Sequence, residues 1–234
     1  MPSSLDLILA RVELVKWVAR IGAVTAEALS RRDGCSVQVA RGRLRGAARV
    51  GLLSSLSPLQ GRPALYTATA AGLRAVELEH LEPGRVSAAN AAHASVCAEV
   101  AARLEVAYPE QRVVGERWLR YEERKAGSAL ASAVLGTNAD GSPALHRPDL
   151  VLWPPVVSGE GSFPIAVEVE LTVKAPRRLE EICRAWAECP CILVVLYVAA
   201  PDVESPLERA IEKANAGEWI VMLSLKRLRE GDDE

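Results

Sequence analysis

The strictest pattern in this sequence is the segment 165–174, IAVEVELTVK, in which apolar residues alternate with a second set. Side chains of a β-strand point alternately to the two faces of a sheet, so the segment predicts a strand with one face made only of Ile, Val and Leu. Glu168 and Glu170 share the other face, roughly 6.6 Å apart. An ordinary half-exposed strand more often carries Thr, Ser, Lys and Arg there. The pair therefore predicts a site on this strand.

A third carboxylate belongs to the preceding predicted strand, HRPDLVLWPP. Leu150 and Leu152 share the face opposite to Asp149, so Asp149 can point away from their core. Carboxylates on neighbouring strands repel each other and raise their own pKa values unless a cation neutralises them. Oxygen ligands suit a hard divalent ion such as Mg²⁺ or Mn²⁺, which can polarise a phosphoryl group and activate water. We therefore expect Asp149, Glu168 and Glu170 to hold a metal, with Glu99 on an earlier helix as a fourth ligand.

The order of elements in the second half favours an α/β domain. The segment 88–108 predicts a long helix, 111–123 a strand and 125–143 a loop. The strands that contain the carboxylates follow, and then come an amphipathic helix, the buried strand CILVVLYVA, another helix and a final strand. Strands separated by helices imply a mixed, partly parallel central sheet.

Charge separates the first part of the chain from the rest. Residues 1–80 contain 11 Lys and Arg against 6 Asp and Glu, a balance of +5, whereas the remainder contains 17 against 24, a balance of −7. A polyanion such as double-stranded DNA is therefore expected on the N-terminal part. The acidic remainder leaves open a protein partner for the second domain.

The N-terminal part predicts three helices and a β-hairpin, which together make a winged helix-turn-helix. Helices are expected over 3–20, after Thr25, and from Ser36 to Gly51; a hairpin and a fourth helix follow. The third helix would enter the major groove, because arginine binds guanine edges and phosphates bidentately. Arg62, at the tip of the hairpin, would reach a phosphate or the minor groove. A basic helix in a protein–protein module is the alternative. The candidate DNA-binding residues on the third helix are Gln38, Arg41, Arg43, Arg45 and Arg49.

The second half resembles the PD-(D/E)xK nuclease fold of restriction enzymes and resolvases, on the element order and on Pro148-Asp149 with Glu168-Val169-Glu170. The resemblance spans about residues 88–228. With the N-terminal winged helix, the run "RPDLVL … IAVEVELTVKAPRRL" looks like the replication-relaxation family of actinobacterial plasmids and integrated elements. Members of that family are thought to be DNA-binding proteins of mobile elements. The resemblance implies a plasmid or mobile-element protein that regulates replication or transcription.

The sequence departs from the nuclease motif at the lysine that follows the acid by two residues, because Glu170 occupies that position. Lys174 is the nearest catalytic substitute, but it lies about 20 Å from Glu168 if the strand stays extended. It would serve the same metal only if the strand ended early. Arg177, Arg178 and Arg184 on the next helix are the other sources of positive charge.

Three functional alternatives follow. The second domain is a Mg²⁺- or Mn²⁺-dependent DNA endonuclease or nickase, a nuclease-like shell whose glutamates pair with Arg147, Arg177 or Arg178, or an unrelated α/β domain. The expected organisation is a DNA-binding domain at 1–80, a linker at 81–87, the nuclease-like domain at 88–228 and an acidic tail at 229–234. A homodimer is an open alternative, because winged-helix proteins often bind paired half-sites.

Features that the sequence lacks indicate the cellular compartment of the protein and argue against several enzyme classes. It has no apolar run near the ~20 residues of a membrane span and no secretory signal at its start. Its five scattered cysteines fit reduced thiols. These features predict a cytoplasmic protein that does not enter a membrane. Phosphate-loop, Ser-His-Asp and HExxH motifs are also missing from the sequence.

Overall fold

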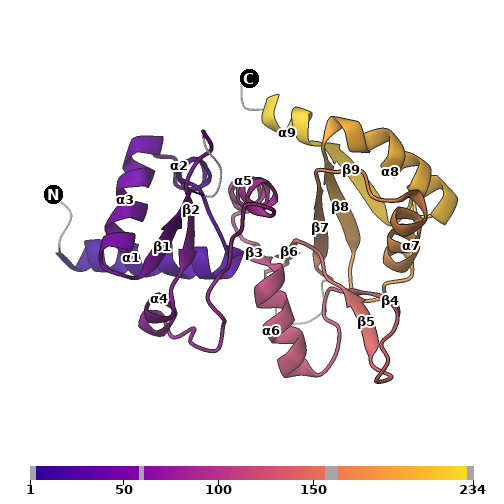
Figure 1. Ribbon diagram of the computed structural model, residues 1–234, viewed down its shortest axis with the longest axis horizontal. Coiled ribbons are helices and arrows are strands. Elements are labelled where there is room, and N and C mark those ends of the chain that lie inside the picture. Colours follow the sequence, from indigo (N-terminus) through magenta and orange to yellow (C-terminus); the bar gives the residue numbers. More distant parts are fainter. Residues whose placement is uncertain (1–3, 58–60, 156–162, 231–234) are drawn as a thin grey trace. The chain divides into compact units, whose positions relative to one another are not determined.

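The computed structural model of the chain describes residues 4–57, 61–155 and 163–230, in two compact units, Met1–Tyr121 and Glu122–Glu234 (Figure 1). The elements of the first unit are α1 (Ser4–Ile21), α2 (Ala26–Asp33), α3 (Val37–Arg49), β1 (Leu53–Leu56), β2 (Leu65–Ala68), α4 (Ala70–Ala75), α5 (Ala91–Ala107) and β3 (Arg112–Gly115). Helix α6 (Glu116–Ala126) contains the boundary. The elements of the second unit are β4 (Ala133–Thr137), β5 (Pro143–His146), β6 (Leu150–Trp153), β7 (Ile165–Glu170), α7 (Pro176–Ala187), β8 (Val194–Ala199), α8 (Pro201–Ala214), β9 (Ile220–Ser224) and α9 (Leu225–Glu230).

Side-chain caps fix where the short helices of the first unit begin. The Thr25 hydroxyl accepts a hydrogen bond from the Ala28 N–H at 3.1 Å and caps α2, and the Ser36 hydroxyl accepts from the Val39 N–H at 3.3 Å and caps α3. Gly34 ends α2 in the left-handed region, with φ of 60°, which glycine adopts without strain. The turn between α2 and α3 is therefore encoded locally.

The core of the first unit lies between α1, α2 and α3, where Trp17, Leu29 and Leu44 are fully buried. The β1–β2 hairpin is antiparallel, with a register from Leu53↔Ala68 to Leu56↔Leu65. A bridge between Val24 and Tyr66 joins β2 to the segment before α2. The hairpin thus extends from a three-helix core.

Helix α5 and strand β3 belong to the first compact unit, whereas the sequence placed residues 88–121 in the second domain. Glu105 on α5 accepts hydrogen bonds from Arg20 at 2.5 Å and from Arg32 at 2.7 Å. Gly115, at the end of β3, lies against the backbone of α1, since a Cβ there would meet the Ile21 carbonyl oxygen at 2.4 Å. These contacts explain why the compact division falls after Tyr121.

The second unit confirms the predicted mixed α/β class. Strands β6, β7, β8 and β9 are neighbours in that order; β6 pairs antiparallel with β7, while the β7–β8 and β8–β9 pairs are parallel. Helices α7 and α8 lie side by side (Figure 1), and β4 and β5 form a separate antiparallel hairpin.

Three expected elements are wrong. The strand predicted over 111–123 ends at Gly115, and the chain continues as helix α6. The buried residues Leu119 and Glu123 are four positions apart, which is the spacing of one helix face. The loop predicted over 125–143 contains β4. The strand predicted over 165–174 ends at Glu170.

Within the described ranges of the chain, no helix has the length and apolar character needed to cross a membrane.

Candidate functional site

Asp149, Glu168 and Glu170 lie near the end of β7 in the second unit. Leu150 pairs with Val167 across β6 and β7, and continuing this register by one residue places Asp149 opposite Glu168, on the same face of the sheet. An Asp149 carboxylate oxygen accepts a hydrogen bond from the Val169 N–H at 2.8 Å. Glu170 follows Glu168 by two positions and shares its face.

Glu168 is buried, with 8% of its surface exposed, and its carboxylate has two side-chain partners. One of its oxygens, Oε1, lies 2.7 Å from Nε2 of His146 and accepts the Trp186 indole N–H at 3.2 Å. Burial raises the pKa of Glu168, and the Asp149 charge raises it further, against the lowering effects of His146 and Lys174. The site therefore holds a carboxyl group whose ionised form is disfavoured unless more positive charge is supplied.

Lys174 returns to the acids instead of lying about 20 Å away, because β7 ends at Glu170 and the chain bends back. Its ammonium forms an ion pair with the Glu170 carboxylate. Burial lowers the pKa of Lys174, whereas the charges of Glu168 and Asp149 raise it. The strand therefore ends early enough for Lys174 to reach the acids. One electrostatic cluster contains the four candidate catalytic residues, Asp149, Glu168, Glu170 and Lys174.

Two of the arginines that the sequence offered as partners for the glutamates pair with other acids. Arg147 donates to Glu123 at 2.8 Å, and Arg178 donates to Glu181 at 3.4 Å on the exposed side of α7. Arg177 is exposed on the same helix, and Arg184, the other source of positive charge there, donates to Glu180 at 2.6 Å. Arg178 is near enough to lower the pKa of Lys174 by charge repulsion.

A buried carboxylate at Glu123 was missed by the sequence reasoning. Its Oε1 accepts hydrogen bonds from the Ser132 hydroxyl at 2.5 Å and the Leu130 N–H at 3.1 Å, while Oε2 accepts from Arg147. These bonds compensate the cost of burying the charge. Glu123 thus anchors the segment that leads from α6 into β4.

His146 and Trp186 were also missed as partners of Glu168. Neither residue is among the candidate site residues that the sequence indicates. The signal for Trp186 is its place among the buried residues of α7, which cover the sheet at Glu168. His146 has no such signal, because its position depends on how β5 lies beside the sheet.

Glu99, the proposed fourth metal ligand, lies on α5 in the first unit. It pairs there with Arg103, with an N–O distance of 3.4 Å. The structure therefore places Glu99 in a different compact unit from the three other acids.

The basic residues of α3 divide into two groups. Arg41 faces Glu27 at 3.5 Å, and Arg43 forms an ion pair with Asp33, so both are tied to α2. The second group is exposed and consists of Gln38, Arg45 and Arg49. Among the residues that the structure describes, neither Arg45 nor Arg49 has a carboxylate partner. Arg62 is exposed beside the hairpin; part of the predicted turn, residues 58–60, falls outside the described residues.

The Glu168→Gln variant is expected to gain stability relative to the wild-type chain as the pH rises. The raised pKa means that the folded state binds this proton more tightly than the unfolded state, so the free energy of unfolding falls as pH rises above the ordinary carboxyl pKa of about 4.3. The variant removes that loss. Thermal unfolding between about pH 4 and pH 8 measures the difference, with Glu181→Gln, an exposed glutamate, as the control. A difference that is constant with pH would contradict the assignment of a raised pKa.

Comparisons of this chain with protein-family models, with curated proteins and with solved structures give no match.

Proposed function

We propose that this protein binds double-stranded DNA through the first unit, which we interpret as a winged helix-turn-helix with α3 as the recognition helix and β1–β2 as the wing. The observation that carries the proposal is the exposed stripe of α3. At about 100° per residue, Gln38, Gly42, Arg45 and Arg49 lie within about 60° of one another around the helix axis. This stripe presents an amide and two guanidinium groups, the donors that read adenine and guanine edges or hold phosphates.

Gly42 supports the same interpretation. A glycine inside a helix costs about 1 kcal/mol relative to alanine, so its place in α3 opposes helix stability. A Cβ at Gly42 would meet no atom within 4 Å, so internal packing does not explain the glycine. A small residue in the middle of the stripe allows the helix backbone to approach a groove closely.

Replacing Arg45 and Arg49 with alanine is expected to weaken binding to duplex DNA by roughly 10- to 100-fold, because each phosphate or base contact contributes about 1 kcal/mol or more. Fluorescence anisotropy with a labelled duplex measures the affinity at a fixed salt concentration. The matched control is Arg74→Ala with Arg85→Ala, which removes the same charge at exposed positions outside α3 and the hairpin. Equal affinities for the two double variants would refute the proposed role of α3.

The positive balance of residues 1–80 favours a DNA partner. The resemblance to the replication-relaxation family implies that such a protein regulates replication or transcription of a plasmid or mobile element. DNA is the partner in this account. The second unit then acts on the same DNA or organises it.

The second candidate function is metal-dependent DNA hydrolysis in the second unit, favoured by the cluster of Asp149, Glu168, Glu170 and Lys174. These carboxylates are ligands that suit Mg²⁺ or Mn²⁺, and the raised pKa of Glu168 indicates that the cluster has room for more positive charge. A bound divalent ion supplies Lewis acidity and an activated water. Asp149, Glu168 and Glu170 would hold it, and the Lys174 ammonium would orient a phosphate oxygen or water.

A further inference from the structure

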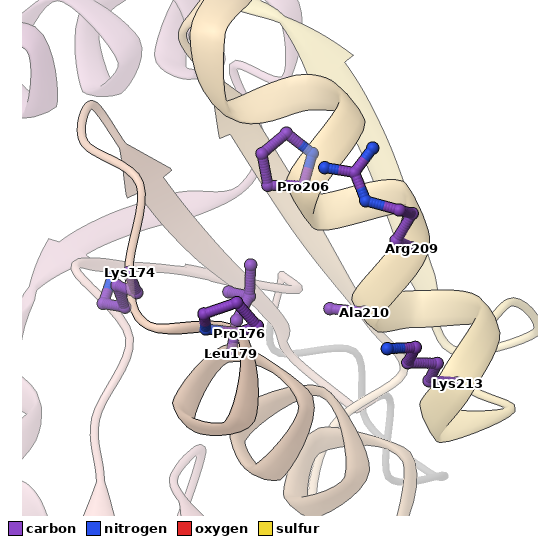
Figure 2. Close-up of a pocket in the computed structure, with 7 residues that line it drawn as sticks. All are labelled: Lys174, Pro176, Leu179, Pro206, Arg209, Ala210 and Lys213. Carbon is purple, nitrogen blue, oxygen red and sulfur yellow. The ribbon is translucent and has the colours of Figure 1, made fainter.

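A small pocket of the second unit lies between the segment that follows β7 and helix α8, with a cavity volume of about 60 Å³. Figure 2 shows Lys174, Pro176 and Leu179 on one side and Arg209 and Lys213 on α8. Leu179 and Ala210 are buried and give the pocket an apolar floor. Every charged residue that lines it is a cation.

Among the residues that the structure describes, the two cations on α8 have no acidic partners. Arg209 donates to the Ser205 hydroxyl at 2.7 Å, and neither Arg209 nor Lys213 forms an ion pair within the described parts of the chain. They are four residues apart on one face of the helix, where like charges destabilise a helix by a few tenths of a kcal/mol. An anion bound between the two side chains would attract both cations and offset their mutual repulsion.

The third cation connects the pocket to the acid cluster. Lys174 lines the pocket and also forms an ion pair with Glu170. A ligand in the pocket is therefore one side chain away from the carboxylates at the end of β7. The cations offer N–H donors to phosphate oxygens, and the apolar floor suits the carbon face of a sugar.

We infer that this pocket binds a phosphate of a nucleic-acid strand through Arg209 and Lys213, with Lys174 between that phosphate and the acid cluster. The inference rests on the proposed function, because it takes the polyanion to be the DNA that α3 binds. It adds a second contact with the strand, in the second unit.

The test compares Arg209→Ala/Lys213→Ala with the control Arg124→Ala/Lys125→Ala in the full chain. The control removes the same charge from exposed positions on α6. Alanine has the highest helix propensity, and far-UV circular dichroism of both variants checks that each remains folded. Binding of a labelled duplex is measured from low to moderate salt. The slope of log K against log salt changes by about 0.9 for each phosphate that the protein no longer neutralises.

The pocket variant is expected to bind the duplex roughly 10-fold more weakly and with a slope shallower by about 1.8, while the control keeps the wild-type slope. The change should add to that caused by Arg45→Ala/Arg49→Ala, because the two sites lie in different units. A pocket variant that behaves like its control would overturn the inference even if α3 binds DNA as proposed.

A second arm titrates inorganic phosphate into the full chain by calorimetry. Phosphate binding that the pocket variant abolishes, without any change in DNA binding, would make the pocket a site for a free anion and would contradict the strand contact. If the wild-type chain binds no duplex, the proposed function and this inference both fail. A slope that changes only in the α3 variant removes this inference alone.

Discussion

Trp186→Ala is expected to lower the free energy of unfolding of the second unit by about 3–5 kcal/mol, the usual cost of removing a large buried aromatic side chain. Trp186 is fully buried, its ring lies 5.6 Å from that of His146, and its N–H donates to Glu168. The substitution leaves a cavity and removes a hydrogen bond from a buried carboxyl group, so both effects destabilise the fold.

Urea denaturation followed by far-UV circular dichroism measures this loss without depending on tryptophan fluorescence. Trp219→Ala is the control, because Trp219 is 42% exposed and its removal should cost much less. Equal stability of the two variants would show that α7 does not pack over Glu168 as described.

Asp149→Asn is expected to slow metal-dependent nicking of supercoiled DNA by roughly 100-fold or more. In the hydrolytic candidate, Asp149 is one of the carboxylates that hold the metal, so its loss removes several kcal/mol of transition-state stabilisation, and each ~1.36 kcal/mol corresponds to a tenfold change in rate. The wild-type chain should convert supercoiled plasmid to open circles in Mg²⁺ or Mn²⁺. Binding of duplex DNA by α3 should not change.

Asp202→Asn is the control for this assay, since Asp202 is an exposed aspartate in the first turn of α8. If the wild-type chain nicks no DNA in either metal, or if Asp149→Asn nicks as fast as the wild type, the hydrolytic candidate is rejected. The DNA-binding proposal for the first unit would still stand.

The sequence predicted the faces of β7 but not its end. Alternation in IAVEVELTVK is a local property with a period of two, so it correctly placed Glu168 and Glu170 on one face. The strand stops at Glu170 because its parallel neighbour β8 stops at Ala199, directly opposite. Beyond that pair, the Ala200 N–H donates to the Glu170 carbonyl oxygen as the neighbouring chain leaves the sheet. The length of a partner strand cannot be read from the alternation itself, so the sequence could state the return of Lys174 only as a condition on where the strand ends.

The surroundings of Glu168 show the same limit. His146 and Trp186 come from elements 22 and 18 residues away in the sequence and meet at one carboxylate oxygen. Their types are ordinary for a strand end and a buried helix face, and only the packing of α7 and β5 brings them together.

For α3, the sequence located the basic segment but could not rank its arginines. The helix predicted from Ser36 to Gly51 placed Gln38 and the four arginines on one element. Which arginines form ion pairs depends on α2, because its Glu27 pairs with Arg41 and its Asp33 pairs with Arg43. The three-dimensional arrangement therefore singles out Arg45 and Arg49.

The salt dependence of duplex binding tests the central claim most directly. If Arg45, Arg49 and Arg62 each neutralise a phosphate, the slope of log K against log salt should be about −2.7 or steeper. Arg45→Ala/Arg49→Ala should reduce its magnitude by about 1.8, whereas Arg74→Ala/Arg85→Ala should leave it unchanged. A slope near zero for the wild-type chain, or one that the α3 substitutions do not alter, would contradict DNA binding through this helix.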